Sequence, residues 1–368
     1  MADQSCRTIP AEGRKRQWKW RFCYIPTLVL CVLTMGCAVS LTPATVSPAP
    51  TRSSENLMVE DAHLFLMWRG ADRHAPLLLW LHGGPGGAER PLFRYFNSDL
   101  EDHFVVAYWD QRGAGRSFDP QADPQRLTIA RHLADLDVIV DHLRQSLSQE
   151  KIALIGHSWG AALGLLYTQS HPDKVSALMA VNPLVSTRKA QHAQYDFVLN
   201  KALRCKDDNV LIRLRSIGPP PHKRATQALE VEKLADRYGG VFHNKPDYTW
   251  VTVRAILSGL VTPWELPGFI RANNLSLEAM NDELLGLDLP HSVPRINVPV
   301  FFFLGRHDRH LGATVAATYF RALQAPIKQL IWFEESAHNI PFEEPDLFNV
   351  NVLNALQEIG IAEVKTCR

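Results

Sequence analysis

The chain has 368 residues, enough to bury a large core, which indicates one large domain or two. Its 39 basic and 38 acidic residues nearly balance, so the composition gives no support for a nucleic-acid partner. Four of the six cysteines lie in the first 50 residues, so no disulfide framework stabilises the fold. The sequence leaves open whether the other two, Cys205 and Cys367, pair with each other.

The N-terminal segment differs from the rest of the chain. Basic residues gather between Arg14 and Arg21, and an uncharged, mostly apolar stretch from Phe22 to Leu41 follows. This pattern predicts an export signal over residues 1–37. Either Cys37, in a sequence that loosely resembles a bacterial lipobox, is lipidated, or the apolar stretch stays as a membrane anchor. We expect an exported, membrane-tethered protein, with residues 38–56 as a flexible Ser/Thr/Pro/Ala-rich spacer; the alternative is a leader without function.

From Leu57 onward, short apolar runs alternate with longer amphipathic segments. Nearly continuous apolar strands separated by helices are typical of a mostly parallel sheet with helices on both faces, so we predict an α/β fold. The segment 127–147 has the apolar spacing of a helix packed on such a sheet. The predicted strands are 64–68, 77–81, 104–109, 152–155, 175–181, 298–304 and 329–333.

The alternation stops between Leu184 and Pro294. This segment is polar and helical in character, with amphipathic helices predicted at 225–238 and 275–287. An insertion at this point would lie over the carboxyl ends of the strands, where ligands bind in open α/β sheets. We therefore predict a helical lid at 186–294, inserted into a core formed by 57–185 and 295–368.

The most specific motif is Gly156-His157-Ser158-Trp159-Gly160, which follows the strand predicted at 152–155 and precedes a stretch of small residues. A strand, a sharp turn and a helix in this order make the nucleophile elbow Gly-x-Ser-x-Gly. The flanking glycines are needed because a Cβ beside the serine would collide with the adjoining strand or helix. We predict that Ser158 is a nucleophile; the alternative is a surface serine in a glycine-rich turn.

A serine hydroxyl needs a base within hydrogen-bond reach, and a carboxylate must orient that base. In this topology the chain order is serine, acid, histidine. Asp308 follows the strand predicted at 298–304, and His338 follows the one at 329–333. Both loops belong to the same edge of a parallel sheet as Ser158. We predict His338 as general base and then general acid, and Asp308 as the group that fixes its tautomer.

Residues next to these motifs compete for the same roles. The loop after the strand at 175–181 contains Asn182 and Pro183 and offers no carboxylate, so Asp308 keeps the role of the acid. Three further histidines flank motif residues and are expected to take no part in catalysis: His157, His307 and His310.

A tetrahedral intermediate needs two preorganised N–H donors, one from the residue after the nucleophile and one from a loop after an earlier strand. Trp159 supplies the first donor. The glycine-rich loop 82–87 follows the strand predicted at 77–81, and we predict Gly84 as the second. The alternative for this loop is a plain tight turn.

Three motifs carry a resemblance to a known family: His82-Gly83-Gly84-Pro85-Gly86, Asp110-Gln111-Arg112-Gly113-Ala114-Gly115-Arg116-Ser117, and the elbow with its tryptophan. In this order and spacing they resemble the prolyl aminopeptidase (proline iminopeptidase) branch of the α/β-hydrolases, from about Leu57 to Glu358. The resemblance implies an α/β-hydrolase fold and release of an N-terminal residue, proline, through an acyl-enzyme. It also implies that Asp110 and Arg112 brace the loops of the site.

The same resemblance implies a site for the substrate ammonium group, which the family holds with lid glutamates, one of them beside a tryptophan. Trp264-Glu265 is the only Trp-Glu pair in the predicted lid, so Glu265 is the predicted substrate-binding residue. Other glutamates of the lid remain alternatives: Glu230, Glu232 and Glu283.

Two other functions remain open. A carboxylic-ester hydrolase would use the same triad with an apolar lid pocket, and a hydrolase-fold binding protein would lack turnover. Epoxide hydrolases and dehalogenases are disfavoured because they need a carboxylate at the position of Ser158. We expect a small-molecule or short-peptide substrate, no cofactor, no metal, and membrane contact through the N-terminal segment alone. The candidate apolar pocket residues are Phe197, Val198, Ile256, Leu260, Trp264 and Phe269.

Overall fold

The computed structural model of the chain describes residues 50–243, 248–257 and 259–362. The predicted signal or anchor at 1–37, with Cys37, and most of the predicted spacer lie outside these residues, as does Cys367. Within the described ranges, no helix combines the length and the apolar character that crossing a membrane requires.

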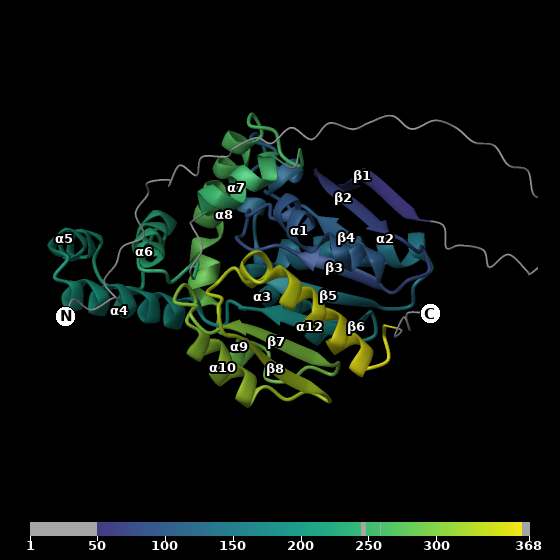
Figure 1. The fold of residues 1–368 in the computed structure, drawn as a ribbon. Helices are drawn as coiled ribbons and strands as arrows, with labels where there is room; N and C mark the ends of the chain where they lie inside the picture. Colours follow the sequence, from purple (N-terminus) through teal and green to yellow (C-terminus); the bar gives the residue numbers. More distant parts are fainter. Residues whose placement is uncertain (1–49, 244–247, 258, 363–368) are drawn as a thin grey trace, which may run out of the picture.

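The described residues form an eight-stranded sheet with the order β1-β2-β4-β3-β5-β6-β7-β8 (Figure 1). Strand β2 is antiparallel to β1 and β4, and every later neighbour in the sheet is parallel. The strands are β1 (Thr51–Val59), β2 (Ala62–Gly70), β3 (Leu77–Leu81), β4 (Val105–Trp109), β5 (Ile152–His157), β6 (Val175–Val181), β7 (Val300–Gly305) and β8 (Lys328–Phe333).

Strand β1 corrects one boundary predicted from the sequence, because residues 51–56 belong to this strand and not to a spacer. These residues pair with β2 along their whole length, from Thr51 opposite Gly70 to Val59 opposite Ala62. Exposed residues such as Arg52 and Ser54 alternate with partly buried ones, as an edge strand allows. The polar sequence of an edge strand lacks the apolar run that marks the other strands.

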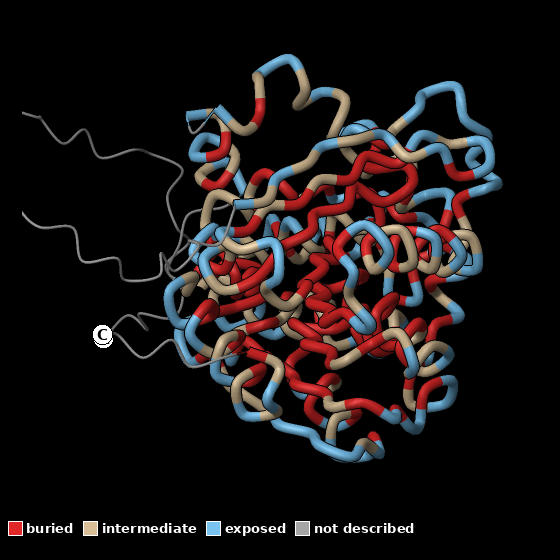
Figure 2. Tube along the Cα trace, turned by 90° about the vertical axis from the view of Figure 1, so that its right-hand side faces the viewer, coloured by how far each residue is buried: buried red, intermediate tan, exposed pale blue. Residues whose placement is uncertain are grey.

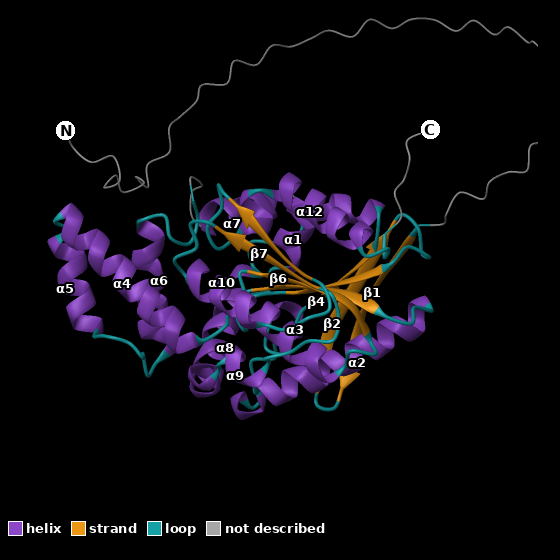
Figure 3. Cartoon of the chain, turned by 90° about the horizontal axis from the view of Figure 1, so that it is seen from below, coloured by secondary structure: helices purple, strands orange, loops and turns teal. Residues whose placement is uncertain are grey.

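Helices cover both faces of the sheet (Figure 3). One face carries α2 (Ile129–Leu147), α3 (Trp159–Ser170), α9 (Leu289–Ser292) and α10 (Ala313–Ala322). The other carries α1 (Arg90–Asn97), α11 (Ile340–Glu343) and α12 (Pro345–Glu358). Within the described residues, three short 3-10 turns complete the core: η2 (Ser98–Asp102), η3 (Gly115–Ser117) and η4 (Pro124–Arg126).

The longest of the covering helices shows how the local sequence sets helix ends. Thr128 begins α2 by accepting a hydrogen bond from the backbone N–H of Arg131 at 3.1 Å. Ser148 ends the helix in a left-handed conformation, with a φ of 55°.

Two apolar layers fill the spaces between the sheet and its helices. Buried residues run through the middle of the molecule (Figure 2). Strand β5 serves both layers, since Leu154 packs into one and Ile155 into the other. This two-sided burial explains why the parallel strands are continuous apolar runs in the sequence.

Between β6 and β7 the chain leaves the sheet and forms helices α4 (Thr187–Cys205), α5 (Asp208–Ile217), α6 (Ala225–Arg237), α7 (Tyr248–Leu257) and α8 (Leu266–Gly286). We call α4 to α8 the lid helices. Helices α4, α5 and α6 project beyond one end of the sheet (Figures 1 and 3). At the base of the excursion, Ser186 forms an antiparallel bridge with Asp288, and Leu289 donates a backbone hydrogen bond to Val185 at 2.9 Å.

Candidate active site

Ser158 lies at the sharp turn between β5 and α3, with a φ of 56° and a ψ of −115°. A positive φ is costly for a residue with a side chain and is kept only where the surroundings impose it. A Cβ on Gly156 would collide with the backbone of Gly160 and Ala161, and one on Gly160 with the carbonyl oxygen of Leu81. The two glycines therefore let strand and helix approach each other closely enough to form this turn.

His338 and Asp308 lie at the same edge of the sheet, in the loops that follow β8 and β7. His338 Nδ1 is 3.0 Å from Asp308 Oδ2, and both residues are buried. The other carboxylate oxygen, Oδ1, accepts the backbone N–H groups of His310 and Leu311 at 2.8 and 3.0 Å. Because an ionised carboxylate cannot donate, Asp308 holds Nδ1 of His338 in its protonated form and leaves Nε2 as the acceptor.

Burial lowers the pKa of His338 to about 4, although the carboxylate of Asp308 acts in the opposite direction. The neighbouring His310 and His157 also contribute to this lowering of the pKa. For Asp308, burial alone would raise the pKa, but the charge of His338 and its hydrogen bond outweigh it, and the pKa is lowered. At neutral pH the pair is therefore a neutral imidazole beside a carboxylate, the state that a general base requires.

The serine and the imidazole come from neighbouring loops. The ring of His157, the residue before Ser158, lies 4.8 Å from the ring of His338 between centroids, and its Nε2 is 2.9 Å from the backbone oxygen of His338. Among the described residues Ser158 Oγ has no hydrogen-bond partner, and free enzymes often form this contact only with substrate bound.

The glycine-rich loop after β3 also reaches Ser158. A Cβ on Gly83 would lie 3.3 Å from Ser158 Cβ. The Gly83 N–H already donates to Glu89 Oε2 at 2.9 Å. No acceptor within the described part of the chain takes the N–H of Gly84 or Trp159. Both N–H groups predicted to bind the oxyanion are thus unused within the described part of the chain.

Gln111 links the two segments that carry these donors, a role that the sequence did not reveal. Its Oε1 accepts from the indole N–H of Trp159 at 2.9 Å, and its Nε2 donates to the backbone oxygen of His82 at 2.8 Å. Gln111 belongs to the Asp-Gln-Arg-Gly motif, but its two contacts join segments that are far apart in the chain.

The structure gives Asp110 and Arg112 the contacts of bracing residues. Asp110 accepts two hydrogen bonds from Arg90, at 2.9 and 3.2 Å, and one from the backbone of Arg116. Arg112 binds Asp135 on α2 through Nε and Nη2 at 2.7 and 2.9 Å. These contacts tie the loop after β4 to α1, α2 and η3.

The four glutamates considered for the substrate ammonium group lie in different surroundings. Glu265 is engaged locally, since Thr262 donates to it from both its backbone and its hydroxyl and Arg116 lies 3.4 Å away. Glu230 pairs with Arg213 on the surface, and Glu283 accepts the backbone N–H of Ile129. Glu232 Oε2 lies 3.9 Å from His310 Nδ1, and the His310 ring meets that of His338 at 4.5 Å between centroids.

The residues proposed for an apolar lid pocket differ widely in their burial. Val198 is fully buried in the core layer, whereas Trp264 is 81% exposed. Within the described ranges no cluster of His, Cys, Asp and Glu residues is arranged to hold a metal ion.

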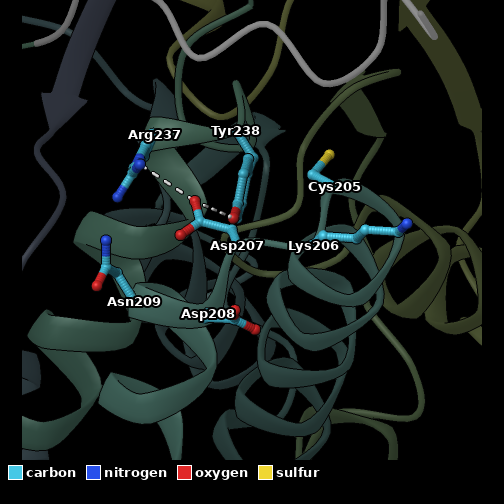
Figure 4. Close-up of a pocket in the computed structure, with 7 residues that line it drawn as sticks. All are labelled: Cys205, Lys206, Asp207, Asp208, Asn209, Arg237 and Tyr238. Atoms are coloured by element: carbon cyan, nitrogen blue, oxygen red, sulfur yellow. Dashed lines mark hydrogen bonds and ion pairs between the residues drawn. The ribbon is translucent and has the colours of Figure 1, made fainter.

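A polar hollow of about 440 Å³ lies where α4 meets α5, beside the end of α6 (Figure 4). Asp207 lies in it, paired with Arg237 at 3.1 Å and accepting the hydroxyl of Tyr238 at 3.1 Å. Cys205, at its rim, is disulfide-bonded. None of the predicted catalytic residues lines this hollow, so we do not assign it to the active site.

Comparison with known proteins places the chain in a family. A family model described as the alpha/beta hydrolase fold matches residues 76–207. The "Probable aminopeptidase YbaC" of Bacillus subtilis is 30% identical over 295 residues, covering 80% of this chain and 93% of that protein. A proline iminopeptidase of Arabidopsis thaliana is 38% identical over 133 residues, 36% of this chain and 33% of that protein.

Solved structures agree on the fold. The crystal structure of a proline iminopeptidase-related protein from Thermus thermophilus matches with a TM-score of 0.60 at 20% identity, covering 84% of this chain and 98% of that one. A bacterial membrane phospholipase A matches with a TM-score of 0.59 at 18% identity, covering 84% and 86%. The chain belongs to the α/β-hydrolase family, in its prolyl aminopeptidase-like branch.

Proposed function

We propose that this protein is a serine hydrolase that works through an acyl-enzyme and releases the N-terminal residue, proline, of a short peptide. The observation that carries the proposal is the buried Asp308–His338 hydrogen bond of 3.0 Å at the edge of the sheet where the elbow presents Ser158. The substrate class rests on the relatives, which are named aminopeptidase and proline iminopeptidase.

In this mechanism the Ser158 hydroxyl attacks the carbonyl carbon of the substrate and its proton passes to Nε2 of His338. Asp308 stabilises the imidazolium through Nδ1, and the N–H groups of Trp159 and Gly84 bind the developing oxyanion. His338 then gives the proton to the leaving amine as the C–N bond breaks. Water attacks the acyl-enzyme with His338 again as base, which releases the amino acid and restores Ser158.

An aminopeptidase must also bind the substrate ammonium group, and we assign this role to Glu232 in preference to Glu265. Glu232 lies beside His310, which packs against His338, whereas both oxygens of Glu265 are held by Thr262 and Arg116. The side chain of Glu232 is 20% exposed, so a ligand can reach it and salt screens its charge only in part.

The test compares kcat/KM for a prolyl amide with that for a neutral acyl ester in Ser158→Ala, Glu232→Gln and Glu230→Gln. Ser158→Ala should lower both by a factor on the order of 10⁴ or more. Glu232→Gln should lower kcat/KM for the amide by about 100-fold, because a charged hydrogen bond is lost. It should leave kcat/KM for the ester within a few-fold of the wild-type value. Glu230→Gln, on the same helix, is the matched control and should change neither.

The outcomes separate the two hydrolase functions. Equal losses on amide and ester in Glu232→Gln would contradict ammonium binding by that residue. Wild-type protein that turns over the ester and leaves every aminoacyl amide intact would identify an esterase. Turnover near the wild-type rate in Ser158→Ala would remove the catalytic assignment altogether.

A further inference from the structure

His157 lies between two hydrogen-bond acceptors. Its Nδ1 is 2.9 Å from Glu89 Oε1, and its Nε2 is 2.9 Å from the backbone oxygen of His338. The residue is 1% exposed, so water does not compete for either contact. A carbonyl oxygen and an ionised carboxylate can only accept. Both ring nitrogens of His157 must then donate, which requires the charged imidazolium.

Glu89 extends this contact to the glycine-rich loop. Its second oxygen, Oε2, accepts the N–H of Gly83 at 2.9 Å. There is no spare room at this point, because a Cβ on Gly83 would lie 2.9 Å from Glu89 Oε1 and 3.3 Å from His157 Nδ1. One continuous chain of hydrogen bonds therefore runs from Gly83 through Glu89 and His157 to the backbone of His338.

The backbone oxygen of His338 accepts a second hydrogen bond, from Asn182. Asn182 donates from Nδ2 to the backbone oxygens of His338 and Ala337 at 2.8 and 3.0 Å, and its Oδ1 accepts the N–H of Gly305. Asn182 is neutral and cannot influence the protonation of His338 by charge. Of the two groups that hold the His338 carbonyl, only His157 brings a charge to the imidazole.

The charges around the pair favour its ionised form. Burial lowers the pKa of His157, but Glu89, the His338 carbonyl and Asp308 together raise it above its usual value. Burial raises the pKa of Glu89, while His157, the Gly83 N–H and His82 together lower it. The uncharged rings of Trp80 and Phe342 pack on the remaining sides of His157.

We propose that Glu89 and His157 form a permanent, buried ion pair that fixes the glycine-rich loop 82–87 relative to the loop that carries His338. The same pair presents a positive charge to the His338 imidazole. Both are positioning residues, because they act through Gly83 and His338 without touching the substrate. The proposal rests on the proposed function of Ser158, Asp308 and His338. It extends that function by naming a charge that acts together with burial to favour the neutral form of the base.

The charge has a measurable effect on the base. The titratable groups that face His338 are Asp308, His310 and His157, and the ring of His157 lies 4.8 Å away. Loss of the positive charge makes the imidazolium of His338 easier to form, so its pKa rises. The acid limb of the pH profile, where His338 becomes protonated, then moves to higher pH.

The experiment uses the full chain with isotope-labelled histidine and two variants, His157→Gln and Glu89→Gln. In the wild type, nitrogen NMR should show protons on both ring nitrogens of His157 at neutral pH, because the pKa of His157 is raised above its usual value. In both variants the acid limb of kcat/KM should move upward by about one pH unit, with kcat reduced. The control is His142→Gln, which breaks a similar histidine–glutamate pair, with Glu55 at 2.7 Å, between α2 and β1.

A single proton on the His157 ring at neutral pH would overturn the proposal. Variants in which kcat falls while the acid limb of the pH profile stays in place would also overturn it, because a purely structural role predicts that result. The NMR result on the wild type decides the question if the variants fail to fold. If no substrate is turned over, the proposed function fails while the protonation state of His157 is still measured.

Discussion

His338 is almost fully buried, and its surroundings set the pH range in which it can accept a proton. Its pKa is lowered from 6.5 to about 4, chiefly by burial. The imidazole is therefore neutral through the physiological range, and kcat/KM should fall only as the pH drops through this lowered pKa. Asp308 works against burial, because its carboxylate stabilises the imidazolium.

Replacing Asp308 by Asn tests how its carboxylate opposes burial in setting the pKa of His338. The Asn amide favours the wrong tautomer of His338, so kcat should fall by a factor on the order of 10⁴. Loss of the carboxylate also removes the group that supports the imidazolium, so the remaining activity should have its acid limb at lower pH. Stopped-flow assays from acid to neutral pH measure both effects. Asp346→Asn, on the exposed start of α12, is the control, and an unchanged kcat in Asp308→Asn would contradict the assignment.

The sequence predicted these residues to very different degrees. Ser158, Asp308 and His338 could be located because each follows an apolar strand, and parallel strands bring such loops together. Glu89 could not be located, and Glu232 was only one of four candidate glutamates, because no periodicity or spacing distinguishes a glutamate that meets its partner only after folding. His157 has the sequence position of a bystander, and the two acceptors that give it a role come from distant segments.

At the scale of elements, the elbow is the join on which the proposed catalytic geometry depends. Helix α3 begins directly after Ser158 and runs so close to β3 that Gly160 has no room for a side chain. By contrast, Gly268 in the first turn of α8 faces open space, and a methyl group added there would have no atom within 4 Å.

Gly160→Ala should therefore lower both stability and turnover. The new Cβ would collide with the carbonyl oxygens of Leu81 and His82, and we expect the free energy of unfolding to fall by about 1–3 kcal/mol. Displacement of the Trp159 N–H should lower kcat at least about tenfold. Urea denaturation and steady-state kinetics measure these changes. Gly268→Ala is the matched control. Equal changes in the free energy of unfolding and in kcat for the two variants would contradict a special role for close packing at the elbow.

The elements can be predicted where burial makes the pattern clear. The parallel strands bury both sides and read as apolar runs, as β5 shows with Leu154 and Ile155 in different layers. Strand β1 buries one side incompletely, so its sequence resembles that of a spacer. Helix α8 starts at Leu266, well before the amphipathic segment predicted at 275, with a proline in its first turn, where proline is favoured.

At the scale of the whole molecule, Arg112 connects three parts of the chain through one buried side chain. It binds Asp135 of α2, Asp61 in the turn between β1 and β2, and the backbone oxygen of Val59. Arg112 is 5% exposed and Asp135 is fully buried. The antiparallel edge of the sheet is thereby fixed to the parallel core.

Arg112→Met should lower the free energy of unfolding by about 3 kcal/mol, because it leaves Asp135 buried without its main partner. The double variant Arg112→Met with Asp135→Leu should recover part of this loss, since no charge then remains buried. Thermal and urea unfolding of both variants measure the difference. Arg126→Met, which removes two exposed ion pairs, is the control and should change little. A double variant as unstable as the sum of the single ones would count against the pairing.

The bridge between Ser186 and Asp288, with the Leu289–Val185 hydrogen bond beside it, brings the first and last residues of the lid excursion into direct contact. A segment inserted at this junction therefore begins and ends at adjacent positions. Evolution could therefore exchange the whole cap of such a hydrolase, and with it the choice of substrate, while the strands and their catalytic loops stayed untouched. Domain grafting between relatives should succeed at this junction for the same reason.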